Sequence, residues 1–95
     1  MSTMIDAAVQ ALSAKLSGGF DGVAKFVIPG EGAIMIDQSG VRAGDEEADV
    51  TLTASPETFQ GMLNGDVNPT MAFMTGKLKV DGNMGLAMQL GSALS

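Results

Sequence analysis

Residues 76–90 read GKLKVDGNMGLAMQL, and the spacing of apolar residues changes within this stretch. In residues 77–81 apolar and polar side chains alternate, which is the pattern of a β-strand with one buried face. From Met84 onward apolar residues recur at intervals of three and four, as on one side of an α-helix. Gly82 suits the turn between them, and Asn83 is a favourable N-cap. The stretch therefore predicts a strand, a tight turn and a closing helix, without a His, Cys or Ser that could act on a substrate.

Three more helices are expected upstream. In residues 3–16 the apolar side chains form one stripe, and Gly18-Gly19 is expected to end this helix. Ser55-Pro56 is a strong helix start, because Ser caps free N–H groups and Pro fits the first helical position. Asn68-Pro69 repeats the signal, so two short helices are expected within residues 56–76. Each helix has an apolar side that can cover a core.

Short strands fill most of the remaining chain. Turn residues, Pro29-Gly30-Glu31-Gly32 and then Gln38-Ser39-Gly40, separate runs in which apolar and polar residues alternate. Because adjacent short strands joined by tight turns pair with their neighbours, these runs predict an antiparallel meander. The predicted strands lie at 22–28, 33–37, 41–43, 48–54 and 77–81.

Length and composition set further limits. A chain of 95 residues is expected to form one domain, residues 1–95. Hydrophobic residues make up 45% of it, yet no apolar run reaches the roughly 18–20 residues that span a bilayer. The start, MSTMIDAAVQ, lacks the basic and apolar regions of a signal peptide. Since there is also no cysteine, we expect a soluble, cytoplasmic protein without stable membrane insertion.

Charge and missing residue types narrow the function. A net charge of −6 and scattered basic residues argue against binding nucleic acid. The absence of His and Cys excludes the common nucleophilic triads and almost every zinc site. The acidic cluster Asp45-Glu46-Glu47 with Asp49 is interpreted as a solvated turn, with Asp49 on the outward side of its strand. We therefore expect no cofactor, no metal, no catalytic residue and no enzymatic activity.

Several segments together resemble a known family. They are Ala48-Asp49-Val50-Thr51-Leu52-Thr53, Gly65 with Asn68-Pro69, Ala72-Phe73, Gly76-Lys77-Leu78-Lys79-Val80, residues 82–90, and more weakly Phe26-Val27-Ile28 and 34–40. In this order they are similar to the sterol-carrier-protein type 2 domain. The resemblance implies an α+β fold with a twisted, largely antiparallel five-stranded sheet covered on one face by helices. It also implies an apolar tunnel between the layers that takes fatty acids, acyl-CoA esters or sterol-like lipids.

The function expected from this resemblance is that of a non-catalytic lipid carrier with a methionine-rich tunnel. A flexible thioether suits a wall that adapts to ligands of different shape, although methionines also fill irregular cores. The alternative is an accessory module that forms dimers or presents substrate to a separate lipid-metabolising enzyme. The expected lipid-binding residues are Phe26, Ile34, Ile36, Leu52, Phe59, Met62, Leu63, Met71, Phe73, Met74, Leu78, Met84, Ala87, Met88 and Leu90.

Overall fold

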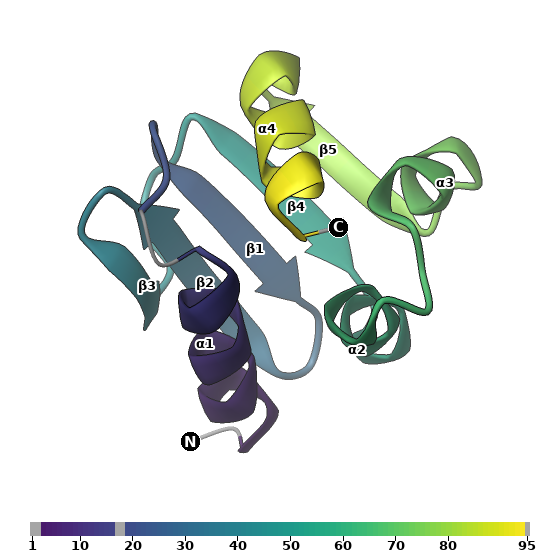
Figure 1. The fold of residues 1–95 in the computed structure, drawn as a ribbon, viewed down its shortest axis with the longest axis horizontal. Helices are drawn as coiled ribbons and strands as arrows, with labels where there is room; N and C mark the ends of the chain where they lie inside the picture. The colour runs from purple at the N-terminus through teal and green to yellow at the C-terminus, as the bar shows by residue number, and fades with distance from the viewer. Residues whose placement is uncertain (1–2, 17–18, 95) are drawn as a thin grey trace.

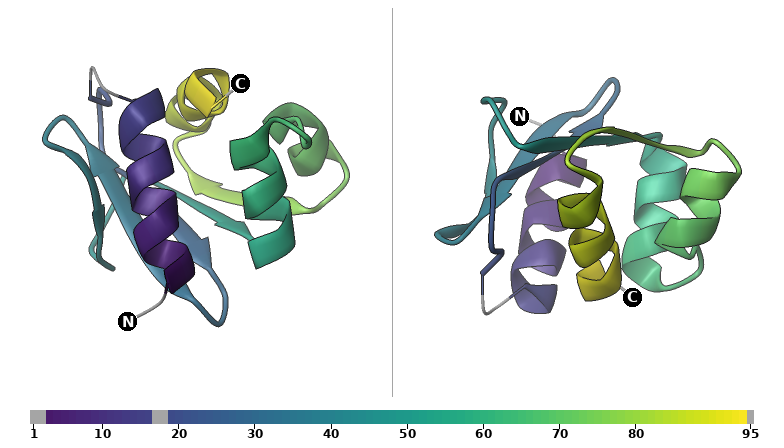
Figure 2. Two further views of the ribbon diagram at one scale, coloured as in Figure 1. Left: turned by 60° about the horizontal axis from the view of Figure 1, so that its bottom comes forward. Right: turned by 90° about the horizontal axis from the view of Figure 1, so that it is seen from above.

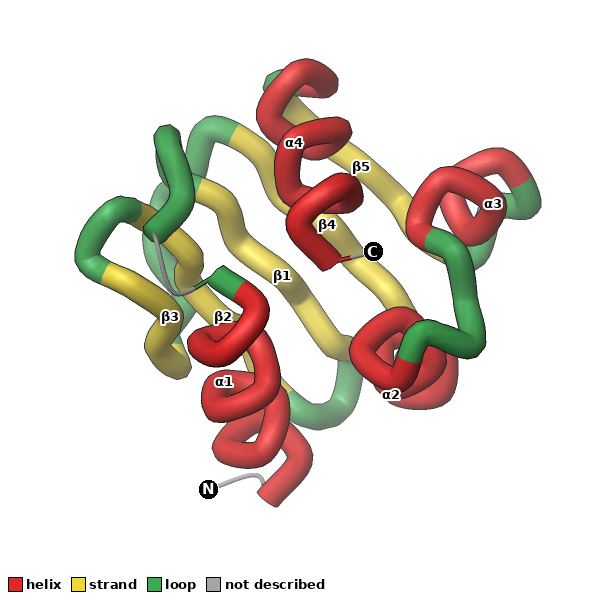
Figure 3. Tube along the Cα trace, viewed as in Figure 1, coloured by secondary structure: helices red, strands yellow, loops and turns green. Residues whose placement is uncertain are grey.

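The computed structural model describes residues 3–16 and 19–94 of the chain, so Gly18 of the predicted helix end lies outside the described residues. Helices and strands follow one another along the chain in the predicted order (Figure 1, Figure 3). Their bounds are α1 Thr3–Lys15, β1 Ala24–Ile28, β2 Gly32–Asp37, β3 Gly40–Ala43, β4 Val50–Ala54, α2 Pro56–Asn64, α3 Pro69–Met74, β5 Leu78–Gly82 and α4 Met84–Leu94.

The strands form one five-stranded sheet in the order β3-β2-β1-β4-β5. Strands β1, β2 and β3 are the predicted antiparallel meander. Strand β4 is not its next member: it lies on the other side of β1, parallel to it, and β5 then pairs antiparallel with β4. Parallel neighbours need a crossover, and here residues 44–49 carry the chain from β3 back to β4. Helices α1, α2, α3 and α4 all lie on one face of the sheet (Figure 2).

Local capping explains where the two middle helices begin and end. The Ser55 side chain accepts a hydrogen bond from the Thr58 N–H (3.2 Å), and Pro56 follows it in the first turn of α2. The Asn68 side chain accepts from the Thr70 N–H (2.8 Å) at the start of α3. Gly65 ends α2 in the left-handed conformation, with φ of 84°, which glycine adopts without a steric penalty. The three signals therefore act as the sequence predicted.

The core lies between the sheet and the helices. Alternate residues of β1 (Ala24, Phe26, Ile28) and β4 (Val50, Leu52, Ala54) are buried and face the helical layer. Helix α1 contacts β2 and β3, whereas α4 contacts β4 and β5. Helix α1 thus covers the half of the inner face that β2 and β3 form, and α4 covers the half that β4 and β5 form. Helices α2 and α3 lie near the end of β4 and the start of β5 (Figure 1).

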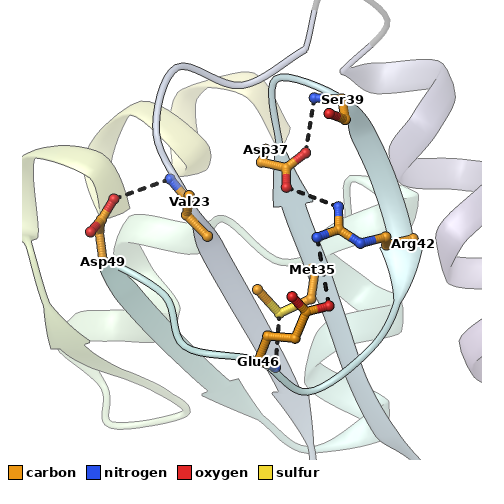
Figure 4. A network of polar contacts seen from close by, with 7 residues as sticks. All are labelled: Val23, Met35, Asp37, Ser39, Arg42, Glu46 and Asp49. Atoms are coloured by element: carbon orange, nitrogen blue, oxygen red, sulfur yellow. Dashed lines mark hydrogen bonds and ion pairs between the residues drawn. The ribbon is translucent and has the colours of Figure 1, made fainter.

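The opposite face of the sheet is covered in part by the crossover. The Glu46 N–H donates to Met35 Sδ (3.4 Å), and Met35 is buried on this face (Figure 4). An ion pair joins Lys25 to Asp45 (2.9 Å) beside it. The acidic cluster is therefore more than a solvated turn, because the Glu46 backbone contacts Met35 and the Asp45 side chain pairs with Lys25.

Three further polar contacts lie near the two ends of this crossover. Arg42 donates to Asp37 (2.8 Å) and lies 3.7 Å from Glu46. Chiefly through that hydrogen bond, the Arg42 guanidinium holds the pKa of the Asp37 carboxyl below its ordinary value. Asp49 accepts a hydrogen bond from the Val23 N–H (3.3 Å), which agrees with its predicted outward position.

Candidate functional site

A cavity of about 290 Å³ lies between helices α3 and α4 and the inner face of the sheet. Strands β1, β4 and β5 form its floor, and the two helices form its walls. The side chains and backbone that line it come from Phe26, Leu52, Pro69, Thr70, Phe73, Leu78, Val80, Met84, Ala87, Met88, Gly91, Ser92 and Leu94.

The floor is set by the register of three strands. Phe26 is paired with Leu52, and Leu52 with Val80, so these three side chains form one row across β1, β4 and β5. Leu78 lies two residues earlier on β5, on the same face. Phe59 of α2 packs against the Phe26 ring with a centroid separation of 4.6 Å. The aromatic pair supports the floor from the side of α2.

The walls depend on how α4 is held. Asn83 caps this helix by accepting from the Leu86 N–H (3.1 Å). The buried residues Ala87, Leu90 and Leu94 recur at helical spacing and hold α4 against the sheet. At Gly91 the helix comes near α3, because a Cβ there would lie 3.6 Å from the Cβ of Pro69. The missing side chain at Gly91 leaves part of the cavity open between the two helices.

The cavity opens to solvent between α3 and α4. Phe73, Met84 and Met88 line it, yet 43%, 45% and 71% of their surfaces respectively are exposed. The hydroxyl side chains of Thr70 and Ser92 belong to exposed residues of the lining as well. The mouth is therefore made of flexible apolar side chains with two hydroxyl groups between them.

The chemistry of the lining is apolar and unreactive. None of the lining residues is charged, and its polar side chains are the two hydroxyls. Among residues 3–16 and 19–94 no group of three or more carboxylates is arranged to hold a metal ion. No helix within the same described ranges is long and apolar enough to cross a membrane. What this arrangement can do is exclude water from a chain-like apolar ligand.

The predicted site residues divide into two groups. The cavity brings together Phe26, Leu52, Phe73, Leu78, Met84, Ala87 and Met88. The others lie elsewhere: Ile34 and Ile36 are buried in β2, Phe59 and Met62 are buried on α2, Leu63 is half-buried on α2, Leu90 is buried on α4, and Met71 and Met74 are exposed on α3.

The structure adds lining residues that the sequence interpretation omitted. These are Pro69, Thr70, Val80, Gly91, Ser92 and Leu94. A signal existed for some of them, since Val80 alternates in step with Leu78 and Leu94 continues the stripe of Ala87. Pro69 was interpreted only as a helix start, and Gly91 was assigned no role in the site. A missing side chain gives no pattern that marks a cavity wall.

Comparison with known proteins is consistent with this geometry. A family model described as the SCP-2 sterol transfer family matches residues 5–95. Hydroxysteroid dehydrogenase-like protein 2 of Xenopus laevis is 40% identical over 81 residues, which cover 77% of this chain and 19% of that protein. Human sterol carrier protein 2 is 50% identical over 46 residues, or 48% of this chain and 8% of that protein.

A solved structure shares the whole fold. The solution structure of sterol carrier protein 2 from Aedes aegypti, in complex with the C16 fatty acid palmitate, superimposes with a TM-score of 0.80. It covers 100% of this chain and 97% of its own at 21% identity. The chain thus matches nearly the full length of that structure, but less than a fifth of the two curated relatives.

Proposed function

The chain belongs to the SCP-2 sterol transfer family, and from this premise we propose that it is a non-catalytic lipid carrier that holds an acyl chain between α3 and α4. The observation that carries the proposal is the cavity of about 290 Å³ with an uncharged, almost wholly apolar lining. A ligand that fills this space removes apolar surface from water on both partners. The palmitate complex of the Aedes aegypti protein supports the choice of ligand class.

Size and charge favour a slim ligand with a small headgroup. The cavity is near the lower end of the roughly 300–1,000 Å³ typical of ligand pockets. A single flexible chain fits such a space more easily than a rigid sterol ring system. The lining supplies no cation for an anionic headgroup, so we propose that the headgroup stays at the mouth, near the hydroxyls of Thr70 and Ser92. For the same reason the phosphates of an acyl-CoA would remain outside, beside a protein of net charge −6.

The reaction chemistry of the site argues for binding alone. General acid–base catalysis needs a titratable group within hydrogen-bond reach of the substrate, and the lining residues include none. We therefore propose that the domain has no enzymatic activity. A reducing compartment such as the cytoplasm is the proposed location, because the chain has no cysteine.

Thermal unfolding with chains of different length tests the carrier function. A ligand that binds only the folded state stabilises it by about 2.7 kcal/mol at one hundred times its Kd. For a domain of this size each kcal/mol raises Tm by about 4–8 °C, so palmitate should raise Tm by about 10–20 °C. Butyrate, which has the same carboxylate but too little chain to fill the cavity, is the matched control. No shift with palmitate, a fatty alcohol or a sterol would refute the proposal.

A second candidate function is that of an accessory module for an enzyme. It is favoured by one observation: the dehydrogenase-like relative is about five times longer than the region it shares with this chain. In that case the domain would present a lipid to a separate enzyme or form a homodimer. Native mass spectrometry separates the two, since a carrier retains lipid as a monomer and the accessory module forms a stable complex without requiring lipid.

A further inference from the structure

The methionines of this chain fall into groups with different exposure. Met35 is buried on β2, and Met62 is buried on α2. Within residues 3–16 and 19–94, every exposed large hydrophobic side chain except Phe73 is a methionine on α3 or α4. These exposed methionines are Met71, Met74, Met84 and Met88.

Two of the exposed methionines are also part of the cavity wall. Met84 and Met88 are one helical turn apart on α4, so they lie on the same side of that helix. Both line the cavity and both are open to solvent. Met71 and Met74 are exposed as well, but they do not belong to the lining. Only at Met84 and Met88, among the described residues, does an accessible thioether also face the space for the ligand.

We propose that Met84 and Met88 form an oxidative modification site, at which peroxide lowers the affinity of the cavity for lipid. This inference rests on the proposed lipid-carrier function. The lone pair of each sulfur attacks one oxygen of hydrogen peroxide, the O–O bond breaks and an S–O bond forms. The sulfur is oxidised by two electrons, and the departing hydroxide takes the proton of the transferred oxygen to leave as water. A dithiol-dependent methionine sulfoxide reductase reverses the change, with one enzyme for each sulfoxide epimer.

Because Met84 and Met88 are exposed to solvent, a sulfoxide on either should affect the lipid complex more than the empty protein. In the empty protein the new oxygen of Met84 or Met88 can point to water, so the fold tolerates it. When an acyl chain fills the cavity, the same oxygen must either lose its water or move the side chain off the ligand. Burying an unpaired polar group costs about 1–3 kcal/mol in proteins, which corresponds to a loss of affinity of about 5- to 150-fold.

The buried methionines give an internal reference. Met35 and Met62 are each 1% exposed, and Met35 Sδ accepts a hydrogen bond from the Glu46 N–H. Oxidant reaches such sulfurs only when the protein opens. In the folded protein, oxidation should therefore be confined to exposed methionines, and the loss of affinity should follow Met84 and Met88 alone.

The test uses the whole chain and a fluorescent fatty acid, dansyl-labelled undecanoic acid. Its Kd is measured before hydrogen peroxide treatment, after treatment, and after incubation with both sulfoxide reductases. Peptide mass mapping reports the oxidation at each methionine. The same series is run on M84L/M88L, which has no thioether in the wall, and on M71L/M74L, which has none on α3.

The expected result is an increase in Kd of about tenfold on oxidation in the unsubstituted chain and in M71L/M74L. Reductase treatment should restore the Kd, and Tm of the empty protein should hardly change. In M84L/M88L the ratio of oxidised to untreated Kd should stay near one. The inference is overturned if Met84 and Met88 resist oxidation, if their oxidation leaves Kd unchanged, or if M84L/M88L loses affinity equally. Failure of the untreated chain to bind the probe would instead refute the proposed function itself.

Discussion

Replacing Met88 with Glu should weaken lipid binding without weakening the fold. The Met88 side chain lines the cavity but is 71% exposed, so the carboxylate of Met88→Glu stays hydrated in the empty protein. Substitutions at exposed helix positions usually change stability by no more than about 0.5 kcal/mol, and Glu and Met have similar helix propensities. A bound chain would cover the remaining surface and strip water from the new charge.

The size of the effect follows from that exposure. Because less than a third of the side chain is covered before binding, the empty protein bears little of the cost of burying a polar group, and the complex bears most of it. A carboxylate costs at least as much to bury as a neutral polar group, so the lower part of the 1–3 kcal/mol range for neutral groups, about 1–2 kcal/mol, gives a minimum increase in Kd of roughly 5- to 30-fold. Isothermal titration with palmitate measures it. Met88→Gln separates shape from charge, and a fatty alcohol in place of palmitate removes repulsion between two carboxylates.

Met74→Glu is the matched control for this substitution. Met74 is 73% exposed and lies on α3 outside the cavity lining. The substitution introduces the same charge as Met88→Glu. Its Kd should stay within about twofold of the unsubstituted value, which is the noise expected for a surface change. Equal losses in both variants would contradict the cavity as the binding site and would favour the sequence-based assignment of Met74 to lipid contact. An unchanged Kd in Met88→Glu would contradict the role of α4 as a wall.

Three further changes test the packing and charge that hold the site. Gly91→Ala should raise Tm by about 2–8 °C, because alanine stabilises a helix by about 0.5–1 kcal/mol over glycine and its Cβ would meet Pro69 at an ordinary contact distance. An unchanged or lower Tm would show that α4 needs the gap at Gly91. Gly82→Ala should cost more than about 2 kcal/mol in urea unfolding, since φ is +111° and the new Cβ would clash with the Asp49 carbonyl. The lowered pKa of Asp37 predicts that its contact with Arg42 stabilises the fold above the ordinary carboxyl pKa of about 4 and is lost as pH falls through the lowered value. Asp37→Asn should therefore be less stable than the unsubstituted chain at pH 7, and the difference should vanish in strong acid; a constant difference across pH would rule out the charge contribution.

The sequence predicted the elements well because each has a local cause. Alternation in residues 48–54 and the cap at Ser55 act on their immediate neighbours, and the structure has a strand and a helix start there. Gly82, which was predicted to form a turn, is instead the last residue of β5, and Asn83 alone separates it from α4. The order of the strands in the sheet does not follow from local sequence. Alternation tells which face of β4 is buried, but a face pattern is the same whether the neighbour is β3 or β1. The crossover over Met35 decides the strand order. The acidic residues of this crossover would suit an ordinary turn equally well, so they do not reveal it.

The site was harder to predict than the fold, because a buried apolar residue has the same pattern in a filled core and in a cavity wall. Phe26 and Phe59 are both fully buried and touch each other, yet Phe26 lines the cavity and Phe59 does not. The difference lies in what packs above them. Gly91 opens space between α4 and α3 by the side chain it lacks, and that space depends on the distance between two helices far apart in sequence.

Methyl NMR offers the most direct test of whether an acyl chain occupies the α3–α4 cavity. With protein labelled with ¹³C at the methionine methyls, Met84 and Met88 report on the cavity wall, Met71 and Met74 on the exposed surface, and Met35 on the far face of the sheet. After addition of palmitate, nuclear Overhauser effects should connect the chain methylenes to the methyls of Met84 and Met88 but not to that of Met35. Contacts to Met71 and Met74 alone, or saturable binding with no contact to α4, would contradict the account.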